Sequence, residues 1–234
     1  MSKLQKGFTL VEIAIVMVII GLLLGGILKG QEMITQAKIK NALADFSGIS
    51  AAYYGYQDRY RQLPGDDPNA GVRWAGAANG NGNGVVEGTY NQTCPATVTA
   101  NSSAVPGTTP VPLESCMWWD DLRRAGFVAG SGGQQPFNAF SGLVGVQTGN
   151  GAGAVVLAPS STPTAGFAGL IVCSANIPDK VAIALDTQMD DGHIASGTVR
   201  GELQSQPNPP ITPTASTTDY QETGTNTYTL CTQI

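Results

Sequence analysis

The sequence predicts an α+β fold in which one long N-terminal helix precedes a mixed C-terminal head. Residues 8–60 are predicted to form one continuous helix, because an apolar run from Phe8 to Leu28 is followed by a helical stripe that ends at Tyr60. Beyond Pro64, short strand-like runs alternate with two short helical runs. This alternation within one chain is typical of an α+β domain.

The first half of the long helix has the length of a membrane span. Residues 8–28 contain one charge, Glu12, and at about 1.5 Å per residue they cross a ~30 Å hydrocarbon core. The preceding leader, residues 1–7, carries two lysines, which by the positive-inside rule hold it on the cytoplasmic side. No small-residue cleavage site follows the apolar run, so we expect this segment to stay on the mature protein.

The second half of the helix, residues 29–60, is amphipathic. Its apolar and aromatic residues are spaced alternately by three and four: Ile39, Ala42, Phe46, Ile49, Tyr53, Tyr56 and Tyr60. We therefore expect one helix over residues 8–60 and a globular extracytoplasmic head over residues 61–234.

The head begins with a loop-rich region, residues 61–115, and continues with short elements. In the helical run 116–128, Met117, Trp118 and Leu122 are expected to face inward and the charged residues outward, including Asp120 and Asp121. Strands are expected at 143–147, 154–158 and 168–173, and a helix is expected to start near Pro178. The segments "GTVRG" and "TYTLCTQI" are expected to be late strands, and residues 206–226 are expected to form a Pro/Thr-rich loop.

Four cysteines in a chain with an export segment favour two disulfides in an oxidising compartment. Three pairings exist for four cysteines. We favour the sequential one, Cys94 with Cys116 and Cys173 with Cys231, whose loops stabilise the fold by roughly 3 and 4 kcal/mol in the chain-entropy model. The alternative is four buried thiols.

The Asn-Gly repeat of residues 79–88 has two interpretations. Asn79, Asn81 and Asn83 fall at positions 1, 3 and 5 of an EF-type calcium loop, and Glu87 can add charge. The chelating carboxylates of such a loop are missing, however, and Asn-Gly pairs also make tight turns. The same choice, cation site or solvated turn, applies to the acids at 186, 190 and 191.

Composition argues against two classes of function. The net charge of −5 disfavours nucleic acid as the main partner, because a duplex binder needs a basic face. The single histidine, His193, is not accompanied by a GxSxG, P-loop or HExxH motif. We therefore expect no enzymatic activity, and no cofactor other than the calcium considered above.

The segment "KGFTLVEIAIVMVIIGLL" resembles the N-terminal signal of type IV pilins and pseudopilins. That resemblance implies a pilin-like fold, with the helix packed on a head that holds a small antiparallel sheet. It implies cleavage after Gly7 by a prepilin peptidase and methylation of the new N-terminus at Phe8. It also implies a partner for Glu12, because a carboxylate at the centre of a membrane helix costs about 2.5–3.5 kcal/mol.

In the family this glutamate is thought to pair with the N-terminal amine of a neighbouring subunit during assembly. Carried over, Glu12 pairs with the amine of an adjacent Phe8 and sets the axial register. The alternative is a glutamate favoured by the dipole at a helix N-terminus.

The resemblance implies a polymer of identical or related pilins, built by inner-membrane assembly machinery. The subunit would first lie in inner-membrane lipid and then in an extracellular type IV pilus, as a major subunit or as a minor or tip pilin with a ligand-binding head. Lys29 departs from the pattern, because many pilus-forming pilins carry a proline around this position. The departure favours the alternative, a periplasmic pseudopilin of type II secretion.

Overall fold

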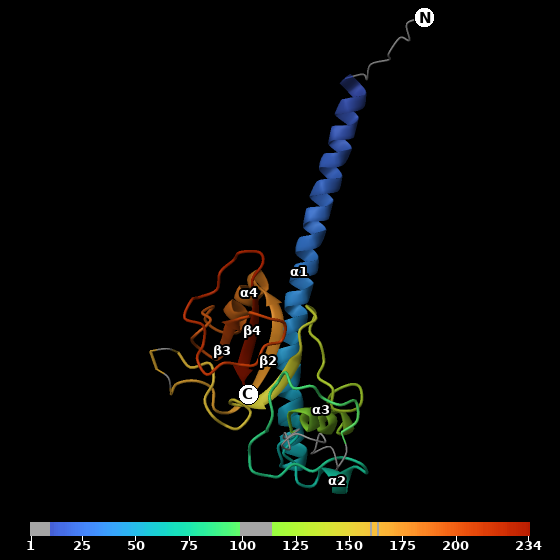
Figure 1. Ribbon diagram of the computed structural model, residues 1–234. Coiled ribbons are helices and arrows are strands. Elements are labelled where there is room, and N and C mark those ends of the chain that lie inside the picture. The colour runs from blue at the N-terminus through green and yellow to red at the C-terminus, as the bar shows by residue number, and fades with distance from the viewer. Residues whose placement is uncertain (1–9, 99–113, 160, 163) are drawn as a thin grey trace, which may run out of the picture. The chain divides into compact units, whose positions relative to one another are not determined.

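A computed structural model describes residues 10–98, 114–159, 161–162 and 164–234. The chain divides into two compact units, one up to Lys40 and a second over residues 41–234. The elements are α1 (Leu10–Tyr60), α2 (Ala70–Arg73), α3 (Glu114–Arg124), β1 (Val144–Thr148), β2 (Leu170–Pro178), α4 (Asp179–Met189), β3 (Val199–Leu203) and β4 (Thr227–Gln233), and all but β1 are labelled in Figure 1.

The α1 helix belongs to both units. In the first unit it is the one described helix that is long and apolar enough to cross a membrane. In the second unit its last residues form part of a folded core, with Phe46, Ile49, Tyr53 and Tyr56 buried. These residues belong to the stripe spaced by three and four, so the amphipathic pattern predicted the buried face, although Tyr54 beside it is 56% exposed.

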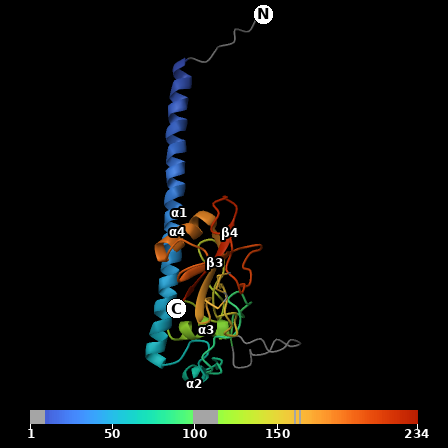
Figure 2. The same ribbon diagram turned by 90° about the vertical axis from the view of Figure 1, so that its left-hand side faces the viewer.

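The second unit contains one four-stranded antiparallel sheet in the order β1-β2-β4-β3. Its two central strands, β2 and β4, are buried along almost their whole length. The α4 helix packs against β2, β3 and β4 near one end of the sheet (Figure 2). This confirms the predicted α+β fold with a long apolar N-terminal helix and a small antiparallel sheet.

Among the described residues, two clusters of buried side chains form parts of the core that do not include α1. The larger surrounds the central strands and includes Tyr90, Leu157, Phe167 and Ile171. The smaller surrounds the Cys94–Cys116 pair and Met117. At about 25 cal/mol per Å2 of apolar area, each fully buried large side chain contributes roughly 1.5–3 kcal/mol.

The expected strand at 154–158 is wrong. Its residues make only single bridges, from Val156 to Phe167 and from Ala158 to Thr214. The reason is the backbone of Leu157, whose φ of 48° turns the chain out of the extended conformation. The run is apolar because Val156, Leu157 and Ala158 are buried in the core. Burial alone does not produce the hydrogen-bonded ladder of a strand.

The expected exposure of two acids in α3 is also wrong. Asp120 and Asp121 are 3% and 2% exposed. Asp120 pairs with Arg124 one turn later at 2.6 Å, and Asp121 accepts the backbone N–H of Gly65 at 2.7 Å. The α3 helix therefore buries the Asp121 carboxylate on the face that meets the loop after α1. Sequence periodicity alone cannot distinguish such a polar but buried face from a solvent-exposed one.

Candidate functional site

The N-terminal part of α1 presents an exposed apolar surface. From Leu10 to Leu28, its large aliphatic residues are between 45% and 86% exposed. A Cβ added at Gly21, Gly25 or Gly26 would meet no atom within 4 Å outside the helix. Such a surface requires lipid or another apolar protein surface around it.

Glu12 lies in the first turn of α1 and is exposed. Gly7 and Phe8, the residues of the predicted processing site, lie outside the described residues. Lys29 continues the helix without interruption and pairs with Glu32 at 2.7 Å. The helix therefore continues through position 29 as regular α-helix.

The Asn-Gly repeat brings three of its four predicted ligands together. The side-chain amides of Asn81 and Asn83 donate to the two carboxylate oxygens of Glu87 at 3.2 and 3.1 Å. Their own carbonyl oxygens accept the N–H groups of Asn83 and Val85. Asn79 does not join this group; its side-chain carbonyl accepts the N–H of Gly71 instead. This is the hydrogen bonding of turn residues.

A buried carboxylate lies at the centre of this loop. Asp66, 3% exposed, accepts the N–H groups of Gly82, Asn83 and Gly84 at 2.6, 3.1 and 2.7 Å. Glu114, the first residue of α3, accepts those of Asn81 and Glu87. These oxygens are therefore used by N–H donors, which fits the turn interpretation of the repeat better than the calcium interpretation.

Sequence reasoning missed Glu114 and Asp121 as site residues. Burial raises the pKa of each to about 7, and the backbone N–H groups that they accept oppose that rise. Nearby, Asp67 accepts the hydroxyl of Tyr56 at 2.7 Å and pairs with Arg73. No motif could have identified Glu114 or Asp121, because their backbone N–H donors come from segments distant in sequence.

The acids after α4 form a second cluster. The oxygens of Asp186, Asp190 and Asp191 lie within 4.8 Å of one another. Asp186 is fully buried, which corrects the expectation that this acid is solvated. Burial raises its pKa to about 6, and the hydrogen bond that it accepts from the Tyr220 hydroxyl at 2.5 Å opposes this rise. The exposed His193 pairs with Asp219 at 2.7 Å.

Both disulfides join the cysteines in the sequential pairing. Cys94 and Cys116 are 5.4 Å apart at their Cα atoms. Cys173 and Cys231 are opposed on β2 and β4, with Cα atoms 4.0 Å apart. The second bond joins β2 to β4, and the Pro/Thr-rich loop 206–226 connects β3 to β4 within the segment that this bond closes.

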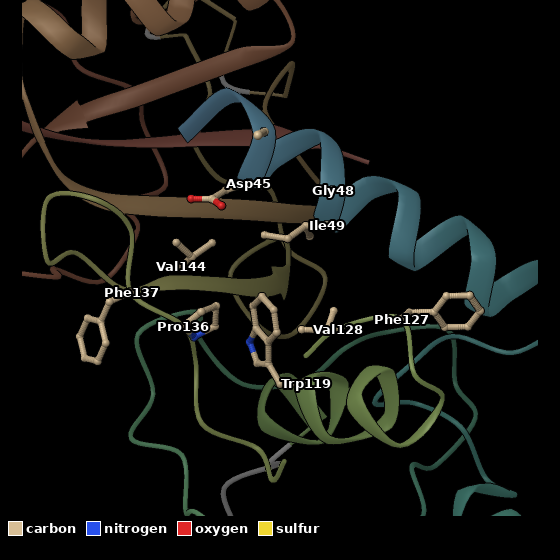
Figure 3. A pocket seen from close by; sticks show the side chains of 10 residues that line it. Asp45, Gly48, Ile49, Trp119, Phe127, Val128, Pro136, Phe137 and Val144 are labelled. Atoms are coloured by element: carbon tan, nitrogen blue, oxygen red, sulfur yellow. The ribbon is translucent and has the colours of Figure 1, made fainter. Parts of the chain in front are cut away.

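A cavity of about 280 Å3 opens within the second unit (Figure 3). It lies between the last part of α1, which supplies Asp45 and Ile49, and Trp119 of α3. Pro136 and Val144 complete its apolar wall. Partial burial raises the pKa of Asp45. Apart from Asp45 and Gly48, the lining consists of apolar and aromatic side chains.

Comparison with known proteins points to the N-terminal segment. The family model of the prokaryotic N-terminal methylation motif matches residues 2–28. The "Fimbrial protein" of Neisseria meningitidis serogroup B (strain ATCC BAA-335 / MC58) is 36% identical over 73 residues, which are 31% of this chain and 43% of that protein. The match thus spans less than half of the relative's length.

No solved structure matches the chain. The classification therefore rests on the motif, on the fimbrial relative, and on the long apolar helix followed by a head with an antiparallel sheet. These features support a relationship to the type IV pilin family, carried by the N-terminal segment that the motif and the fimbrial relative cover.

Proposed function

We propose that the chain is a prepilin, cleaved after Gly7 and N-methylated at Phe8, that polymerises into a type IV pilus filament. The observation that carries this proposal is the methylation motif at residues 2–28, joined to a helix whose large aliphatic side chains are exposed from Leu10 to Leu28. Lipid covers that surface before assembly, and the helices of neighbouring subunits cover it afterwards.

The assembly step uses Glu12. Before cleavage, the nitrogen of Phe8 is an amide and carries no charge. Cleavage turns it into an amine, which attracts the carboxylate of a neighbouring subunit within the membrane, where the charge is costly to leave unpaired. Processing and polymerisation are thereby coupled through one ion pair.

The partners follow from this sequence of events. A prepilin peptidase removes the leader, inner-membrane assembly machinery extracts the subunit, and identical or related pilins receive it. The subunit lies first in the inner membrane and then in an extracellular filament. In this role the head is a structural coat without catalysis.

A pseudopilin of type II secretion is the second candidate. The observation in its favour is Lys29, which continues α1 as regular helix and pairs with Glu32 where many pilus-forming pilins have proline. In that case the same processed subunit assembles into a periplasmic pseudopilus.

The test compares Glu12→Ala with Glu32→Ala. Both variants remove one glutamate from the same helix, but Glu32 lies beyond the predicted membrane span and is 60% exposed. We expect both proteins to be processed and held in the membrane, with sheared filaments reduced on the order of tenfold or more only in Glu12→Ala, because an intramembrane charge is worth several kcal/mol. Normal filament yield from Glu12→Ala contradicts the registry role.

A further inference from the structure

The Asn-Gly repeat contains bonds that are chemically reactive. The chain has four Asn-Gly pairs, beginning at Asn79, Asn81, Asn83 and Asn150, and all four asparagines are exposed. In such a pair the glycine nitrogen loses its proton and attacks the side-chain Cγ. A ring C–N bond forms, the bond to the side-chain nitrogen breaks, and ammonia leaves. Water then opens the ring to aspartate or isoaspartate. Glycine favours the attack because it has no Cβ to obstruct it.

The four attacking nitrogens have different hydrogen-bond acceptors. Those of Gly82 and Gly84 donate to the two carboxylate oxygens of Asp66, at 2.6 and 2.7 Å. Those of Gly80 and Gly151 donate to neutral backbone carbonyls, each at 2.9 Å. The chain therefore contains two pairs with a charged acceptor and two matched pairs with a neutral one.

A charged acceptor disfavours the reaction in two ways. The attacking nitrogen must first give up a charge-assisted hydrogen bond, which is stronger than a neutral one. It must also become an anion beside an existing negative charge, which raises the cost of removing its proton. Asp66 is 3% exposed, so little water lies between the two charges to screen them.

We propose that Asp66 protects the Asn81–Gly82 and Asn83–Gly84 bonds from deamidation. The two bonds are modification sites that react when the loop leaves this carboxylate. In the folded chain, Asn79 and Asn150 are then the faster sites.

Deamidation at a protected site also changes the loop permanently. Asn81 and Asn83 each donate a side-chain N–H to Glu87. An acid at either position has no such N–H and places a second negative charge beside Glu87. The hydrogen-bonded loop cannot re-form unchanged, so the modification records an earlier opening of the loop.

The experiment follows all four sites in one molecule. The full chain in detergent micelles is incubated at pH 8, and peptide mapping by mass spectrometry measures the rate of amide-to-acid conversion at each asparagine. The wild type is compared with Asp66→Asn, which keeps the side-chain shape and removes the charge. The same chain in denaturant gives the unprotected rates.

We expect Asn81 and Asn83 in the folded wild type to react on the order of tenfold more slowly than in denaturant, the effect of a charge-assisted hydrogen bond. Asp66→Asn should accelerate these two sites and leave Asn79 and Asn150 unchanged. Equal rates at Asn81 and Asn83 in the folded and denatured wild type overturn the proposal. Acceleration of Asn79 together with Asn81 and Asn83 in Asp66→Asn also overturns the proposal, because it shows that the whole loop has loosened and not that one charge has been lost.

Discussion

At the scale of single residues, buried carboxylates organise the loops of the second unit. Two kinds occur. Burial raises the pKa of Glu114 and Asp121 to about 7. For Asp179, burial raises the pKa, but the N–H groups of Gly224, Lys180 and Thr223 outweigh it and hold the pKa below the ordinary value. The two kinds affect stability in opposite directions as the pH changes.

The acids with raised pKa predict a fall in stability between pH 5 and pH 8. Their folded pKa of about 7 exceeds the ordinary values of 4.5 and 3.8, so within this window the folded state holds more protons than the unfolded state. The free energy of unfolding therefore decreases as the pH rises. We expect the Tm of the full chain in detergent to be at least about 3 °C lower at pH 8 than at pH 5.

Glu114→Gln should reduce this dependence, because the amide keeps the shape and does not titrate. The matched control is Glu222→Gln, whose carboxylate is 56% exposed and should leave the pH profile unchanged. A Tm that is equal at pH 5 and pH 8 in the wild type, or an identical slope in Glu114→Gln, contradicts the assignment. Below about pH 4 stability should fall again, as Asp179 becomes protonated.

At the scale of elements, glycines show where backbone segments approach closely. Gly145 lies in β1, and a Cβ there would overlap the backbone carbonyl of Tyr90. Gly48 lies in α1, and a Cβ there would meet no atom within 4 Å outside the helix. The same substitution should therefore act oppositely at the two positions.

We predict that Gly145→Ala lowers the free energy of unfolding by roughly 1–3 kcal/mol, because the overlapping atoms belong to backbone that cannot rotate away. Gly48→Ala should raise it by about 0.5–1 kcal/mol, because alanine loses less backbone entropy in a helix. Thermal unfolding of both variants measures the difference. Equal Tm values would mean that β1 and the Tyr90 segment are not packed as described.

The sequence predicts an element well when the contacts that form it join residues close together in the chain. The stripe along α1 predicted the burial of Phe46, Ile49 and Tyr56, because helix periodicity is local. The strand at 154–158 was wrong because one residue, Leu157, has a positive φ that composition does not reveal. The roles of Glu114 and Asp66 could not be predicted, because their donors are brought to them only by the folded chain.

At the scale of the whole molecule, the disulfides close loops of different size. Cys94 and Cys116 are 22 residues apart, and Cys173 and Cys231 are 58 apart. In the chain-entropy model the longer loop stabilises more, by roughly 1 kcal/mol. The longer loop also contains most of β2, α4, β3 and part of β4.

We therefore predict that Cys173→Ser with Cys231→Ser lowers the Tm more than Cys94→Ser with Cys116→Ser does. Each pair should cost about 2–4 kcal/mol. Thermal unfolding of the two double variants under non-reducing conditions gives the order. The reverse order would show that the loop 206–226 and its strands are held mainly by packing.

The assembled filament tests the central claim, which is that this chain is a processed subunit of a surface polymer. The measurement is mass spectrometry of filaments sheared from the cell surface. We expect a dominant chain that begins at methylated Phe8, with both disulfides formed. The same processed chain found only in the inner membrane would favour the pseudopilin, and a chain that still carries residues 1–7 would contradict the account.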